Sequence, residues 1–202
     1  MDPAPIKIVS RYDFEHMDVD GYPFAISIRE ADETELPRPS YSGKRLNLSF
    51  YDLTEGPGIA TADDVRAVRS FAEGWVTAVH AGESQAGLIV HCFAGVSRSS
   101  AVALIPLLLY YQEELAAAKR LFEVNRWADP NTHVVYLVEE SFQLGGDLFT
   151  ALEEAKMGML VFDGTDRRVS KIIRQNARNY KYHKMIPPGK ESSLKGEKDM
   201  VA

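Results

Sequence analysis

The sequence predicts an α/β protein with a mostly parallel central sheet flanked by helices. Short segments with the pattern of strands alternate along the chain with longer segments that have helical spacing. Residues 88–90 are consecutive apolar residues, which is typical of a strand buried on both faces of a parallel sheet. The helix expected after them is almost wholly apolar, so we expect it to lie at the centre of the protein.

Three further strands are expected before residue 88. Residues 6–10 and 22–28 are rich in β-branched and aromatic residues, and residues 45–53 alternate between apolar and polar side chains. Residues 11–21 are acidic and indicate turns. Residues 31–43 contain acids and two prolines, and they predict a surface loop.

The rest of the chain is expected to be helical. Thr61 has the chemistry of an N-cap, and Asp63 and Asp64 would occupy the first turn of the helix that it opens. Pro106 lies inside the central apolar helix and is expected to kink it or to remove a hydrogen bond. The later helices are expected over residues 98–112, 115–125 and 132–143. A further helix is expected after Gly145 and Gly146, through residue 155.

The chain has 202 residues and a formal net charge of −6. Its charged residues are distributed unevenly between two parts of the chain. Residues 1–155 hold 12 Lys and Arg and 24 Asp and Glu, whereas residues 156–202 hold 11 and 5. The asymmetry predicts a main domain over 1–155, a basic and partly helical extension over 156–185 and a disordered tail over 186–202. An acidic main domain does not favour nucleic acid or an anionic membrane as partner.

Cys92 is the only cysteine, so no disulfide framework within the chain is expected. A reactive thiol requires a reducing compartment, and the N-terminal residues lack the pattern of a signal peptide. The longest apolar run, residues 101–111, is too short to span a bilayer. We therefore expect a cytoplasmic protein, and the sequence leaves its oligomeric state open.

Residues 87–100, GLIVHCFAGVSRSS, predict a strand, a tight loop and the start of a helix. The loop would turn its backbone N–H groups around an anion, and the helix would direct its positive N-terminal end at the same place. Arg98 would bind two oxygens of a phosphate with its planar fork. The phosphate-binding residues expected beside Arg98 are those of the loop: Phe93, Ala94, Gly95, Val96 and Ser97.

These residues suit nucleophilic catalysis on phosphorus. Cys92 would attack as the thiolate, and Ser99 would donate a hydrogen bond to the sulfur when it leaves. His91 is expected to hold the loop and to favour the thiolate. Each donor aimed at the charge of the transition state contributes roughly 100- to 1000-fold. We therefore expect the loop amides and Arg98 to contribute more to the rate than the activation of the thiolate does.

The segment HCFAGVSRS resembles the signature loop of the cysteine-based protein tyrosine phosphatases, His-Cys-x-x-Gly-x-x-Arg-Ser/Thr. NRWADPNTHVVYLVEESFQ is similar to the region after the active-site helix of dual-specificity phosphatases. The resemblance covers roughly residues 45–150, is closest to the dual-specificity-like and small bacterial branch, and implies the phosphatase fold, with 1–155 as the catalytic domain. The alternatives are a buried cysteine with a helix-capping serine, and a sulfurtransferase loop, which is usually one residue shorter.

The resemblance also implies an aspartate, upstream of the signature, that protonates the leaving oxygen and later activates water. Asp52 is our choice because it ends an apolar strand and precedes a glycine-containing loop. Asp63 and Asp64 are rivals, although acids in a first helical turn also favour the helix dipole, and Glu55 is a lesser candidate. Asn131 would orient this loop or a water molecule, or would cap a helix.

The sequence therefore predicts a protein phosphatase that hydrolyses phosphotyrosine, and also phosphoserine or phosphothreonine, through a phosphocysteine intermediate. One alternative is a phosphatase of a non-protein phosphomonoester, such as a phosphoinositide, a nucleotide or an RNA 5′ end. Another is a phosphate-binding module with little turnover. No cofactor or metal is expected, because His80 and His133 lack a matching set of ligands and the chemistry requires none.

Overall fold

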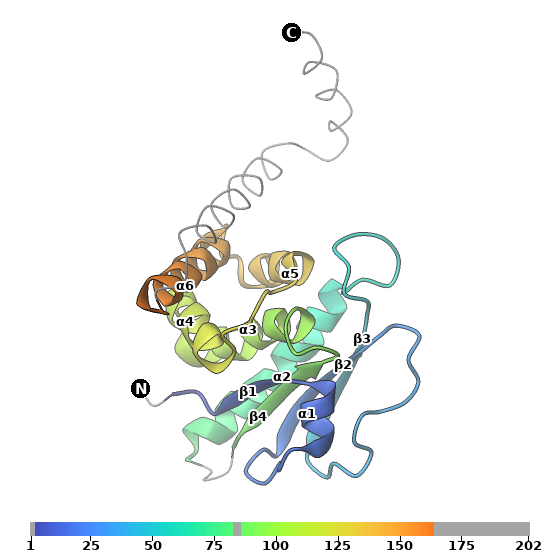
Figure 1. Cartoon of the computed structure of the whole chain (residues 1–202). Helices are drawn as coiled ribbons and strands as arrows, with labels where there is room; N and C mark the ends of the chain where they lie inside the picture. Colours follow the sequence, from blue (N-terminus) through green and yellow to red (C-terminus); the bar gives the residue numbers. More distant parts are fainter. Residues whose placement is uncertain (1–2, 83–85, 164–202) are drawn as a thin grey trace, which may run out of the picture. The chain divides into compact units, whose positions relative to one another are not determined.

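The computed structural model describes residues 3–82 and 86–163, with side chains as far as residue 159. The strands of the described chain form one parallel sheet in the order β1-β4-β2-β3. The predicted α/β class is confirmed (Figure 1). The strands are β1 (Ile6–Ser10), β2 (Phe24–Arg29), β3 (Lys44–Ser49) and β4 (Leu88–Cys92).

The described helices cover the sheet on both faces. They are α1 (Arg11–His16), α2 (Ala62–His80), α3 (Arg98–Tyr111), α4 (Glu114–Val124), α5 (Thr132–Phe142) and α6 (Asp147–Asp163). Helix α3 packs against α2, α4 and α5 on one face, and α1 lies on the opposite face (Figure 1). Because β4 is central and every one of its residues is buried, its carboxyl end is rigidly positioned.

Helix α3 has the central position that its composition predicts. Nearly all of its residues are buried, and the helix continues through Pro106 to Tyr111. On the other face of the sheet, Phe14 packs with Ala25 and Ile89 in a small core beneath α1. Side chains alternate across a strand, so Ile89 and His91 face α1.

Helix α1 was not expected, because residues 11–21 have the composition of a turn. Ser10 and Asp13 form a capping box, in which the Ser10 side chain accepts from Asp13 N at 3.0 Å and the Asp13 carboxylate accepts from the Ser10 backbone. Such a box satisfies two of the donors left free at a helix start. Six residues are too few to show helical periodicity, so the cap was the available signal.

Strand β3 ends earlier than predicted, at Ser49 rather than at Asp52. The chain stays beside β2 for one more residue, since Phe50 N donates to Arg29 O over 3.1 Å. Tyr51 N then donates to Gly58 O over 2.8 Å and closes a loop. Asp52 therefore lies in the loop at the carboxyl edge of the sheet.

The chain divides into two compact units, Met1–Lys156 and Met157–Ala202, with the boundary inside α6. Most of the extension predicted over 156–185, and all of the tail predicted over 186–202, lie outside the described residues. None of the helices in the two described ranges has the length and apolar character needed to cross a membrane.

Candidate active site

The loop between β4 and α3 closes tightly against the first strand. Gly95 adopts φ +73°, in the left-handed region, and a Cβ added there would lie 2.5 Å from the backbone carbon of Val9 and 2.6 Å from Ser10 N. Only glycine can adopt this positive φ and also fit so close to the β1 backbone without strain. Ser10 pairs with Cys92 in the β1–β4 register, so the end of β1 supports the loop directly.

Hydrogen bonds from outside the loop hold its carbonyl groups. Arg11 N donates to Phe93 O over 3.1 Å, and Asp129 N donates to Val96 O over 3.1 Å. Asn125 Nδ2 donates to Gly95 O over 2.7 Å. In a planar trans peptide the C=O and the following N–H point in opposite directions. These bonds therefore turn the intervening amides toward the inside of the loop.

Cys92 lies at the base of the loop, with 1% of its surface exposed. Gly95 N donates to its sulfur over 3.3 Å, and Ser99 Oγ is 3.2 Å from the same atom. Donors of this kind stabilise negative charge on sulfur. The structure therefore brings together Cys92 and Ser99, which the sequence analysis expected to lie side by side.

Arg98 is buried in the first turn of α3, where its guanidinium has four neighbours, among them Arg29 O, which accepts from Nη1 at 3.3 Å. Nη1 donates to Phe50 O over 2.9 Å, and Nη2 bonds Glu30 Oε1 at 2.5 Å. Nε lies 3.9 Å from Asp52 Oδ2 and is a buried nitrogen without a hydrogen-bond partner among the described residues. Arg29 Nε, Arg120 Nε and His91 Nδ1 are also buried without a partner among the described residues, so what distinguishes Arg98 Nε is its position in the first turn after the loop.

Asp52 is tied to the loop and to α5 through one carboxylate oxygen. Ser97 Oγ donates to Oδ1 over 2.7 Å, and Asn131 Nδ2 donates to the same oxygen over 2.8 Å. Ser97 is the N-cap residue of α3, yet its side chain makes no cap hydrogen bond because it is directed at Asp52. Helix α3 thus keeps the anion-binding character of its N-terminus.

His91 is wholly buried beside the loop. Its Nε2 lies 2.8 Å from Ser27 Oγ, and its ring stacks on Phe14 with 4.2 Å between centroids. Burial, followed by repulsion from Arg45, lowers the pKa of His91 to about 4. The ring is therefore neutral at pH 7. It contacts Ser27 and Phe14 beside the end of β4, and the neutral ring carries no positive charge to act on the thiolate. The role expected for His91 stays a prediction.

The rivals of Asp52 are placed differently. Asp64 forms a capping box with Thr61, and Asp63 pairs with Arg66 on the exposed surface of α2. Both therefore serve the start of the helix. Glu55 is exposed in the loop after Asp52. Asn131 combines the two roles considered for it, since its Oδ1 accepts from Val134 N at 3.1 Å while its Nδ2 donates to Asp52.

Sequence reasoning missed Glu30, Ser27 and Asn125. Glu30 follows the end of β2, and this position at the carboxyl edge of a strand was the available signal. Nothing in the pattern indicated that Ser27 would face His91, because that depends on the β2–β4 register. Asn125 holds the loop from the end of α4, a contact that only the tertiary structure reveals.

The histidines outside the signature have other surroundings. His80 is exposed on α2, and His133 Nε2 lies 2.9 Å from Ala60 O. Within residues 3–82 and 86–163, no group of three or more His, Cys, Asp or Glu side chains is arranged to hold a metal ion.

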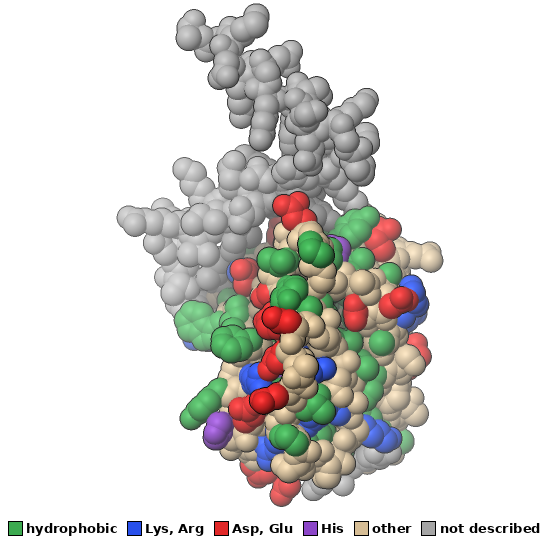
Figure 2. Space-filling view, turned by 90° about the vertical axis from the view of Figure 1, so that its right-hand side faces the viewer, with side chains coloured by type: hydrophobic (Ala, Val, Ile, Leu, Met, Phe, Trp, Pro, Cys, Tyr) green, Lys and Arg blue, Asp and Glu red, His purple; other side chains and the backbone are tan. Residues whose placement is uncertain are grey.

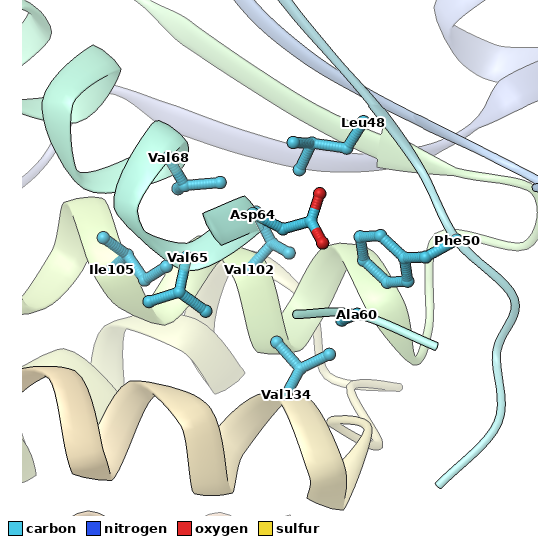
Figure 3. Close-up of a pocket in the computed structure, with 9 residues that line it drawn as sticks. All are labelled: Leu48, Phe50, Ala60, Asp64, Val65, Val68, Val102, Ile105 and Val134. Atoms are coloured by element: carbon cyan, nitrogen blue, oxygen red, sulfur yellow. The ribbon is translucent and has the colours of Figure 1, made fainter. Parts of the chain in front are cut away.

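A small pocket beneath β3 is separate from the loop (Figure 3). Its lining includes neither Cys92 nor Arg98, and Asp64 is its one acidic member. We interpret it as a packing gap of the core. The lining residues are Leu48, Phe50, Ala60, Asp64, Val65, Val68, Val102, Ile105 and Val134.

A scan against protein-family models gave no match, and a search of curated proteins gave none. Among solved structures, human DUSP28 superposes with a TM-score of 0.53 at 20% identity, over 70% of this chain and 93% of that chain. DUSP15 gives 0.49 at 19% identity, over 76% and 94%. The human tyrosine phosphatase-like serine/threonine/tyrosine-interacting protein gives 0.47 at 22%, over 61% and 78%.

The likeness to DUSP28 extends over nearly all of that protein, and at this level of identity it establishes the fold. The all-parallel sheet flanked by helices agrees with it. The described chain therefore has the fold of the cysteine-based protein tyrosine phosphatases of the dual-specificity type, as human DUSP28 does.

Proposed function

We propose that the protein hydrolyses phosphomonoesters through a phosphocysteine intermediate, with phosphotyrosine in proteins as its substrate. The observation that carries the proposal is the unpartnered Nε of buried Arg98, at the mouth of a loop whose amides surround a buried cysteine. A phosphate bound there would supply the missing acceptor. The sulfur of Cys92 would lie beneath its phosphorus atom.

In the first step the Cys92 thiolate attacks phosphorus. An S–P bond forms while the bond from phosphorus to the tyrosine oxygen breaks, and the leaving oxygen takes a proton from the Asp52 carboxyl. The proton is carried by Oδ2, because Oδ1 already accepts hydrogen bonds from Ser97 and Asn131. The loop amides and Arg98 stabilise the charge that develops on the phosphoryl oxygens.

In the second step water hydrolyses the phosphocysteine. Asp52, now a carboxylate, takes a proton from the attacking water, a P–O bond forms, and the S–P bond breaks. The Ser99 hydroxyl, 3.2 Å from the sulfur, donates to the departing thiolate. Inorganic phosphate leaves, and the enzyme returns to its starting state.

The charge around the loop supports a monoester on a protein over a polyanionic small molecule. The loop side chains other than Arg98 are uncharged, and the carboxylates of Glu30 and Asp52 flank the guanidinium. A ligand with several phosphates would meet these carboxylates without further cations from the loop. The loop amides and Arg98 can compensate the charge of a single phosphoryl group, and a neutral aryl ring adds no further negative charge to be repelled.

Hydrolysis of a small aryl phosphate tests the mechanism. Cys92→Ser is expected to abolish turnover, and vanadate to inhibit the wild type while a metal chelator does not. Asp52→Asn is expected to lower the rate by about 100- to 10,000-fold on esters with poor leaving groups, and less on good ones. Turnover retained by Cys92→Ser contradicts the mechanism, and phosphate binding by the wild type without turnover indicates a binding module.

The substrate class needs a separate measurement. We expect kcat/KM to be higher for a phosphotyrosine peptide than for the peptide of the same sequence with phosphoserine. Equal values would indicate dual specificity. Faster hydrolysis of a soluble inositol phosphate than of either peptide would favour a non-protein substrate.

A further inference from the structure

Three aromatic side chains stand exposed on segments that hold the phosphate loop. Tyr12, Phe93 and Trp127 are 69%, 70% and 73% exposed, the highest values among the large hydrophobic residues of the described chain. We call these three the aromatic rim. Large aromatic residues are normally buried, so their exposure around one site indicates a contact surface.

Hydrogen bonds to the loop carbonyls place the segments that carry the rim next to the loop. Phe93 is the first loop residue, and its carbonyl accepts from Arg11 N at 3.1 Å, which brings the neighbouring Tyr12 to the loop. Trp127 lies between Asn125 and Asp129, whose hydrogen bonds to the loop carbonyls are 2.7 and 3.1 Å long. Each rim residue is therefore within two positions of a residue bonded to the loop, or belongs to the loop itself.

The rim residues are held in place although they are exposed. Trp127 N donates to Asn125 Oδ1 over 3.2 Å, and the Arg126 guanidinium lies 5.2 Å from the centre of the Trp127 ring. Tyr12 stacks on His16 with 4.3 Å between centroids. Side chains ordered before binding lose less conformational entropy when a partner binds.

The surroundings of the rim carry negative charge. Glu30 and Asp52 lie at Arg98, and Asp129, which is largely exposed beside Trp127, pairs with Lys156. The nearby cation Arg11 is neutralised by ion pairs with Glu15 and Glu33. On the face drawn in Figure 2, acidic side chains are gathered down the middle, and hydrophobic side chains project at the left-hand margin.

We propose that the aromatic rim binds the residues that flank the phosphotyrosine of a peptide segment, and that it selects apolar and basic flanks over acidic ones. The inference rests on the proposed function and names the substrate class of the same site. Aromatic surfaces bind apolar side chains and, through their ring faces, the cations of Lys and Arg. The carboxylates around the rim would repel Asp and Glu.

The charge balance argues for a peptide rather than a phospholipid in a membrane. Residues 1–155 hold 24 acidic and 12 basic side chains, so an anionic bilayer would be repelled. A segment of a protein with Leu, Phe, Lys or Arg next to the phosphotyrosine complements both the rings and the negative field.

The test compares two phosphotyrosine peptides of equal length, one with Leu and Lys beside the phosphotyrosine and the other with Glu at the same positions. For the wild-type full chain, we expect kcat/KM to be about tenfold higher for the first peptide, as for the burial of one or two apolar side chains. Trp127→Ala should reduce this ratio several-fold, and Trp127→Phe should restore most of it. Tyr136→Ala, at another exposed aromatic residue, on α5, is the matched control and should leave the ratio unchanged.

The outcomes separate this inference from the proposed function. If the wild type hydrolyses neither peptide nor a small aryl phosphate, the proposed function fails. If it hydrolyses both peptides equally, or if Trp127→Ala leaves their ratio unchanged, the rim does not select the flanks and the inference is wrong. Faster hydrolysis of a phosphoinositide in anionic vesicles, lost in Trp127→Ala, would assign the rim to a membrane instead and would also overturn it.

Discussion

The hydroxyl of Ser97 donates a 2.7 Å hydrogen bond to Oδ1 of Asp52 and so joins the phosphate loop to the proposed general acid. Ser97 gives up the capping of its own helix to make this bond. The bond places the acid at the loop through a direct contact, and the same oxygen is shared with Asn131. The position of the acid therefore depends on two donors from different parts of the chain.

Removing the Ser97 hydroxyl should weaken proton transfer. We expect Ser97→Ala to lower kcat about fivefold for esters with poor leaving groups, since one neutral hydrogen bond contributes about 1 kcal/mol. Esters with good leaving groups should be affected less, and Ser97→Thr, which keeps a hydroxyl, should retain most of the rate. The measurement is the dependence of kcat on the pKa of the leaving phenol. A uniform loss over all leaving groups would mean that Ser97 acts only on phosphate binding.

Asn131 allows its two roles to be separated. Asn131→Ala should destabilise the protein by about 1 kcal/mol, because the N-cap of α5 is lost, and should also slow turnover. Asn131→Ser keeps an N-cap oxygen but lacks the amide donor to Asp52. We expect it to recover stability in urea denaturation without recovering kcat. If both properties recover together, the contact with Asp52 has no catalytic role.

His91 makes stability depend on pH in a defined direction. The pKa of His91 is about 4 in the folded protein and 6.5 in the unfolded chain, so between these values only the unfolded state takes up the proton. The stability that His91 contributes is present above pH 6.5 and is lost as the pH falls to 4. The free energy of unfolding should decrease by up to about 3 kcal/mol over this range.

Urea denaturation at a series of pH values checks this slope. His91→Gln should flatten it, whereas His80→Gln, at an exposed histidine, should not. If His91→Gln does not fold, the imidazole resonance of His91 in the wild type gives the answer. A titration midpoint near 6.5 would show that burial does not control this ring.

Gly95 and Gly74 should respond in opposite ways to the same substitution. Gly95→Ala forces a Cβ to within 2.5 Å of the Val9 backbone at φ +73°, so we expect a loss of about 2 kcal/mol or more and of most activity. Gly74 lies in α2 with open space around it, and Gly74→Ala should stabilise the helix by about 0.5–1 kcal/mol. Thermal unfolding and aryl phosphate turnover measure both. An active, stable Gly95→Ala would disprove the close approach to β1.

The sequence was sufficient to predict the strand, loop and helix around Cys92, because burial on both faces and a long apolar helix leave strong periodic signals. It was not sufficient to predict α1, which is shorter than the window in which periodicity can be recognised. The contact between Glu30 and Arg98 depends on the order of the strands in the sheet. No local pattern in a single sequence gives that strand order. The neutral His91 follows from complete burial, which no local pattern around a catalytic cysteine reveals.

The contact between Gly95 and the end of β1 links turnover to the assembly of the sheet. β1 and β4 are adjacent in the sheet but far apart in the chain, so their pairing is non-local and costs loop-closure entropy. The nucleophile's loop has its support only once the first strand has docked beside the last. Recovery of the proposed phosphatase activity during refolding would therefore report the docking of β1, which is one long-range step of folding.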